Sequence, residues 1–98
     1  MQQPLTESMY YILLALKEPR HGYHIMQFVS EMSNGRVQLG AGTTYGALKT
    51  LQQKGLIVAL QGDGRQKDYV ISSEGIHAVQ EEMQRLHELY TNGQIIFQ

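Results

Sequence analysis

The N-terminal third of the chain repeats its apolar residues at helical spacing. In residues 7–17 and again in residues 21–32, apolar side chains recur at i, i+3, i+4 and i+7, which places them on one face of a helix. Thr6 can cap the first helix and Pro19 ends it, while Asn34-Gly35 suits the left-handed turn that closes the second. The two predicted core faces consist of Met9, Ile12, Leu13 and Leu16, and of Ile25, Phe28, Val29 and Met32.

Residues 43–54 predict a third helix with two unlike faces. Ala47, Leu48 and Leu51 share a face that can pack on a core. A slim outer face suits a helix that enters a groove of DNA, and a glycine there, which costs about 1 kcal/mol in a helix interior, favours close approach of another surface. The alternative is an ordinary core helix with a polar side. The outer face is small, polar or cationic and has no acidic residue: Thr43, Gly46, Lys49, Thr50 and Gln53.

The chain after residue 55 predicts a β-hairpin and a last helix. Residues 56–60 form an unbroken apolar run of strand length, and residues 67–71 place Tyr69 and Ile71 on one side of a second strand. The loop between them contains Gly and Asp, which suits a hairpin connection. Ser72 or Ser73 can cap a helix over residues 74–90, which Asn92-Gly93 would end.

The order of these elements predicts an α+β, mostly helical fold. Three helices followed by a two-stranded hairpin indicate a winged helix-turn-helix, in which the hairpin is the wing and the last helix is an addition. We therefore expect a DNA-binding domain in residues 1–72 and a C-terminal dimerisation helix with its tail in residues 73–98. A chain of 98 residues forms one small domain of marginal stability, for which self-association is a common remedy.

Composition argues against an enzyme, a metal protein and a membrane protein. The chain has no cysteine, which excludes disulfides and thiolate chemistry and suits a reducing, cytoplasmic compartment. It has no phosphate-binding glycine loop or nucleophile elbow, and His21 and His24 alone make a poor metal site, so we predict no catalytic residue, metal or cofactor. The longest apolar run, residues 9–16, is far shorter than the ~20 residues that span a bilayer.

Charge is unevenly distributed although the net charge is only −1. Residues 36–67 carry five cationic side chains against one acid, whereas residues 68–98 carry one cationic side chain against five acids. A basic middle that contains the third helix and the hairpin is typical of a surface that meets nucleic acid.

Five segments together resemble the PadR family of bacterial transcriptional regulators. They are residues 11–16 (YILLAL), 21–25 (HGYHI), 42–51 (GTTYGALKTL), 54–57 (KGLI) and 67–75 (KDYVISSEG). The resemblance implies a homodimeric winged-helix repressor of the short subfamily, in which one C-terminal helix pairs the protomers. It also implies release from DNA by a small-molecule effector, which several family members show.

The predicted DNA contacts come from three parts of the chain. The start of a recognition helix meets base edges, and cationic or phenolic side chains meet phosphates. Plainer roles are open for each candidate: a helix cap for Thr43, packed aromatics for Tyr23 and Tyr45, and solvated side chains for the cations. Arg36, in the connector between the second and third predicted helices (residues 36–41), is a weaker candidate. The DNA-binding residues that we predict are Tyr23, Thr43, Thr44, Tyr45, Lys49, Arg65 and Lys67.

The last helix carries apolar residues at alternating spacings of three and four, which is typical of a narrow seam between two helices. We predict that this seam pairs two protomers, so that a dimer reads a pseudo-palindrome in double-stranded DNA. An apolar cavity for an effector could lie between the first and last helices, lined by Met9, Met83, Leu86 and Tyr90. The alternative function is a winged-helix protein-interaction module without DNA binding, which the low net charge and Gln52-Gln53 favour. The predicted seam consists of Ile76, Val79, Met83, Leu86 and Tyr90.

Overall fold

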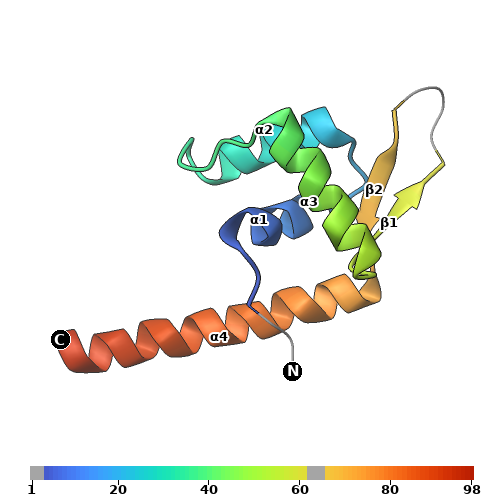
Figure 1. The fold of residues 1–98 in the computed structure, drawn as a ribbon. Helices are drawn as coiled ribbons and strands as arrows, with labels where there is room; N and C mark the ends of the chain where they lie inside the picture. Colours follow the sequence, from blue (N-terminus) through green and yellow to red (C-terminus); the bar gives the residue numbers. More distant parts are fainter. Residues whose placement is uncertain (1–3, 62–65) are drawn as a thin grey trace.

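The computed structural model describes residues 4–61 and 66–98 and contains the predicted elements in the predicted order (Figure 1). The fold is mostly helical, with one two-stranded antiparallel sheet. The prediction of three helices, a hairpin and a final helix is therefore confirmed. The elements are α1 (Glu7–Ala15), α2 (Gly22–Met32), α3 (Ala41–Gln53), β1 (Ile57–Leu60), β2 (Asp68–Ile71) and α4 (Ser73–Phe97).

The core lies where α1, α2 and α3 meet, and the hairpin and the first half of α4 close it. Most of the predicted apolar faces point into it. Met32 is an exception: it lies in the last turn of α2 and its side chain is exposed. The largest fully buried side chains are Ile12, Leu13, Leu16, Ile25, Val29, Thr44, Leu48, Leu51 and Ile57.

Local chemistry accounts for the start of α1, the start of α4 and the end of α2. The Thr6 hydroxyl accepts a hydrogen bond from the Met9 N–H at 3.1 Å, and the Ser72 hydroxyl accepts one from the Gly75 N–H at 3.0 Å. Asn34 and Gly35 adopt positive φ angles of 55° and 77°, which confirms the predicted left-handed turn after α2.

The hairpin packs beside α3 and is also joined to the turn between α1 and α2. Ile57 pairs with Ile71, and Leu60 pairs with Asp68. Arg20 exchanges two backbone hydrogen bonds with Tyr69, at 3.1 and 2.9 Å. The wing strand is therefore fixed in position against the start of α2.

Helix α4 is longer than predicted. It continues through Asn92-Gly93 to Phe97, so the predicted end at that dipeptide is wrong. Asn-Gly permits a left-handed turn but does not impose one, and a glycine inside a helix costs only about 1 kcal/mol. The long helix runs along one side of the molecule and its second half projects beyond the other elements (Figure 1), which gives extents of 54 × 30 × 20 Å.

Candidate nucleic-acid interface

The slim face of α3 points outward. Thr43, Gly46, Lys49 and Gln53 are exposed, and Thr50 is half-buried with its hydroxyl donating to the Gly46 carbonyl at 3.2 Å. Apart from its chain neighbours and the nearby backbone of α3, no described atom lies within 4 Å of a Cβ placed on Gly46, so no packing contact with the described residues requires glycine there. The prediction of an outward, acid-free face is confirmed.

Thr44 does not belong to this face, and its prediction as a DNA contact is wrong. The side chain is fully buried, and its hydroxyl donates to the Gly40 carbonyl at 2.8 Å. The reason is helical spacing: Thr44 lies four residues before Leu48 and seven before Leu51, and so shares their core-facing side. Because α3 begins at Ala41 rather than Thr43, Gly40 is its N-cap, and Thr43 is free of that role.

The predicted residues Tyr23, Tyr45 and Lys67 come together around a hollow of about 270 Å³ between α2, α3 and the wing. Tyr45 is 53% exposed and Tyr23 is 59% exposed, so neither is a core aromatic. Lys67, just before β2, is exposed. Arg65 lies outside the described residues. The lining consists of His21, Gly22, Tyr23, Tyr45, Gln66, Lys67 and Tyr69.

Helices α2 and α3 begin without a side-chain cap among the described residues. Their N-cap residues are His21 and Gly40, and neither makes a side-chain hydrogen bond to the first turn. The first N–H groups of both helices are therefore open to an external acceptor, and the helix dipole favours an anion there.

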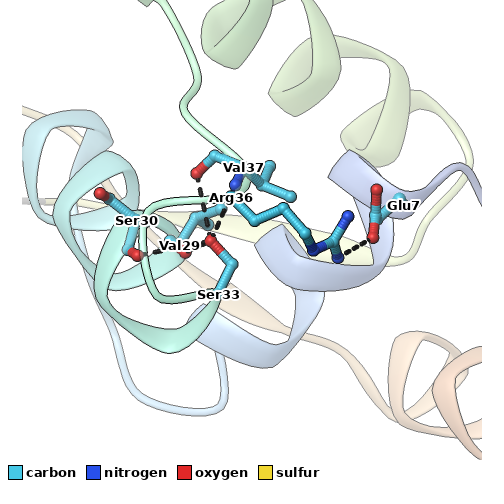
Figure 2. A network of polar contacts seen from close by, with 6 residues as sticks. All are labelled: Glu7, Val29, Ser30, Ser33, Arg36 and Val37. Carbon is cyan, nitrogen blue, oxygen red and sulfur yellow. Dashed lines mark hydrogen bonds and ion pairs between the residues drawn. The ribbon is translucent and has the colours of Figure 1, made fainter.

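Arg36 is directed away from this interface. Figure 2 shows its guanidinium paired with the Glu7 carboxylate at the start of α1. The hydrogen bond from Arg36 lowers the pKa of Glu7. Both side chains are more than half exposed, so the pair contributes little stability. The pair matters because it holds the Arg36 side chain against the start of α1 and away from the interface.

Ser33, at the end of α2, holds the connector that leads to α3 (Figure 2). Its hydroxyl donates to the Val29 carbonyl at 2.8 Å and accepts from the Val37 N–H at 3.0 Å. These bonds hold the start of the connector against the end of α2, and so define the path by which the chain enters α3.

Helix α4 presents most of the predicted seam to the outside. Ile76, Met83, Leu86 and Tyr90 are between 42% and 65% exposed. Val79 is not available: it is buried with Ala78 in the core of its own protomer, so its prediction as a seam residue is wrong. Spacing alone could not tell which side of α4 packs on the chain's own domain.

Glu82 was missed by sequence reasoning. It is a buried carboxylate that accepts a hydrogen bond from Arg85 Nε at 3.1 Å and one from the Leu5 N–H at 3.4 Å. The bonds from Arg85 lower the pKa of Glu82 against the opposing effect of burial. The Glu-Arg spacing of i, i+3 was the available signal. Glu82 joins α4 to the segment that precedes α1.

A second hollow, of about 280 Å³, lies between α1 and α4. Of the residues expected around an effector cavity, Met9, Met83, Leu86 and Tyr90, only Leu86 borders it. The described lining of this hollow consists of Leu5, Glu7, Tyr10, Tyr11, Glu82, Arg85 and Leu86.

None of the described helices is long and apolar enough to cross a bilayer.

The fold and the exposed face of α3 define the class of this protein as a winged helix-turn-helix with an added C-terminal helix. A solved PadR family transcription regulator from Clostridium difficile R20291 has the same fold, with a TM-score of 0.78 and 24% identity over 95% of this chain and 100% of that one. The model of the transcriptional regulator PadR-like family matches residues 12–81. The chain belongs to this family of regulators, which are not enzymes.

Two protein sequences are also similar to the chain. A 37.1 kDa protein of transposon TN4556 from Streptomyces fradiae is 34% identical over 79 residues, which are 80% of this chain and 22% of that protein. Protein X from Lysinibacillus sphaericus is 36% identical over 66 residues, which are 63% of this chain and 61% of that protein. The chain thus spans about a fifth and about three fifths of these relatives.

Proposed function

We propose that the chain is a sequence-specific repressor that binds a pseudo-palindromic operator in double-stranded DNA as a homodimer in the cytoplasm. The observation that carries the proposal is the outward, acid-free face of α3, in a chain of a transcriptional-regulator family. In a helix-turn-helix the second helix of the motif enters the major groove with its N-terminal residues at the base edges. Thr43 would then meet bases, and Lys49, about two turns further along, a phosphate.

The homodimer is supported by apolar surface on α4 that the described protomer leaves uncovered. Up to Glu82, one side of α4 is buried against the rest of the protomer. Beyond Glu82 the same side carries Leu86, Leu89 and Ile96, which are all exposed. A contiguous apolar surface of this kind marks an interaction site. A second copy of α4 would cover it and hold two α3 helices at half-sites about 34 Å apart.

The effector part of the proposal is supported by the hollow between α1 and α4. Its lining combines the aromatic rings of Tyr10 and Tyr11 with the charged groups of Glu82 and Arg85, a mixture that suits a small amphipathic molecule. A compound that both raises the melting temperature of the free protein and weakens its binding to DNA would establish such an effector.

The alternative, a protein-interaction module, is separated from the proposal by a DNA titration. Fluorescence anisotropy with a labelled duplex of mixed sequence, at about 50 and 200 mM salt, should show binding that weakens as salt rises. Lys49→Gln should reduce the slope of log K against log salt by about 0.9 for each protomer. The matched control is Lys54→Gln, an exposed lysine at the C-cap of α3. No binding at the lower salt would favour the interaction module.

The two adjacent threonines should respond oppositely to the same substitution. Thr44→Val removes the part-buried hydrogen bond from the Thr44 hydroxyl to the Gly40 carbonyl and should lower the free energy of unfolding by about 1 kcal/mol with DNA affinity unchanged. Thr43→Val should leave stability unchanged and weaken binding to a selected operator. Urea denaturation and anisotropy on both variants test this, and a loss of affinity in Thr44→Val alone would contradict the assigned orientation.

A further inference from the structure

The hollow between α2, α3 and the wing is lined by hydrogen-bond donors. Its described lining includes three tyrosines, Lys67, Gln66 and His21, whose side chains can all donate hydrogen bonds, and no Asp or Glu. Base edges offer both donors and acceptors, whereas a phosphate offers only acceptors. A cavity that carries cationic and phenolic donors from three elements therefore suits a phosphate better than a base.

Gly22 leaves the space that the Tyr45 phenol occupies. A Cβ on Gly22 would be 2.5 Å from Tyr45 Oη and 2.7 Å from Tyr45 Cζ, which is closer than such atoms can approach. Gly22 does not have a positive φ, so its backbone conformation alone does not require glycine. The contact is with the far end of the half-exposed Tyr45 side chain, so a larger residue at position 22 would displace the phenol rather than the backbone.

We propose that this hollow binds one backbone phosphate of duplex DNA and that Gly22 is a positioning residue, which keeps the Tyr45 hydroxyl at its rim. The proposal rests on the proposed DNA-binding function and names a contact within it. Tyr23, Tyr45 and Lys67 donate to the phosphate oxygens, and the open N–H groups at the start of α2 face the same charge. One phosphate then bridges α2, α3 and the wing, and fixes the angle at which α3 enters the groove.

Two substitutions test the site directly, with anisotropy on a labelled duplex of mixed sequence over a series of salt concentrations. Tyr45→Phe removes only the hydroxyl and should weaken binding about tenfold, as expected for a hydrogen bond to a charged group. Lys67→Gln should reduce the slope of log K against log salt by about 0.9 per protomer. Lys54→Gln, far from the hollow along α3, is the charge-matched control and should leave the affinity within about twofold of the unmodified protein's.

Gly22→Ala tests the positioning role. The added methyl displaces the half-exposed Tyr45 ring, so DNA affinity should fall about tenfold with little change in melting temperature. In a Tyr45→Ala background the same substitution should cost nothing more, because the group that it displaces is already absent. A merely structural role for Gly22 would instead give losses that add.

The outcomes separate this site from the function on which it rests. Unmodified protein that binds DNA while Tyr45→Phe and Lys67→Gln bind equally well would overturn the phosphate site and leave DNA binding intact. Additive losses for Gly22→Ala and Tyr45→Ala would overturn the positioning role. If Gly22→Ala does not fold, Tyr45→Phe and Lys67→Gln still decide the site. Unmodified protein that does not bind at low salt would overturn the proposed function and the site together.

Discussion

Met83→Glu combined with Leu86→Glu should convert the protein to a monomer and weaken its binding to duplex DNA by about a hundredfold or more. Both side chains are exposed in the described protomer, so the substitutions spare its core. In a paired α4 they would place carboxylates in a dry seam, which is costly when no cation is at hand. A monomer then loses the gain in affinity that two linked recognition helices provide, commonly 10² to 10⁴.

Sedimentation velocity at micromolar concentration measures the first effect and DNA anisotropy the second. The matched control is His77→Glu combined with Gln84→Glu, which adds two acids to the same helix at exposed positions seven residues apart, on the side opposite Leu86. That control should remain a dimer. A dimer that survives Met83→Glu with Leu86→Glu, or unmodified protein that sediments as a clean monomer, would remove α4 from its pairing role.

Hydrophobic spacing predicted the elements well because each helix buries one continuous stripe. Ile12, Leu13, Ile25 and Val29 are all fully buried, as their spacing requires. Element boundaries were less predictable. The sequence predicts that α3 begins at Thr43, but its N-cap is Gly40. Glycine has no capping side chain, so the sequence gives no signal for the true start of the helix. Thr44 is predicted as a DNA contact because it lies near the start of the helix, whereas its spacing from Leu48 and Leu51 places its side chain in the core.

The sequence does not show which side of a helix packs on the chain's own core when two sides are equally apolar. Val79 has the spacing of the predicted seam and also that of the core-facing row, and the structure assigns it to the core. Glu82 is a further case, since a carboxylate in that row is buried only because Arg85 and the Leu5 N–H both reach it. Periodicity gives an angle around a helix axis but not the identity of the neighbour at that angle.

In the candidate interface, too, some features were predictable from the sequence and others were not. The outward face of α3 was predictable from residue type and spacing alone. The contact between Gly22 and Tyr45 was not predictable. The two residues are separated by 22 others in the chain, and they meet only because of the relative orientation of α2 and α3. Glycine at position 22 and glycine at position 46 look alike in the sequence. The structure separates them: the first is in contact with a tyrosine, and the second faces outward with no described atom near its Cβ position.

Gly75, in the first turn of α4, has no room for a side chain. A Cβ there would lie 2.1 Å from the Leu56 carbonyl oxygen and 2.6 Å from Ile71 Cγ1. The carbonyl cannot yield easily, because it accepts the Ser72 N–H at 3.0 Å. Helix α4 would have to move away from the hairpin, and this would draw Ala78 and its neighbours out of the core.

Gly75→Ala should therefore lower the free energy of unfolding by about 3 kcal/mol, the upper end of what overpacking a core usually costs, and the melting temperature by more than about 10 °C. Gly46→Ala is the matched control, since it makes the same substitution inside a helix where no described atom obstructs the methyl group. It should raise stability by up to about 1 kcal/mol. Urea denaturation of both variants at one fixed protein concentration tests the pair, because a dimer's stability depends on concentration. Equal stabilities would show that α4 does not press against the hairpin as closely as the structure has it, and the anchoring of the proposed dimerisation helix to the DNA-binding elements would need another origin.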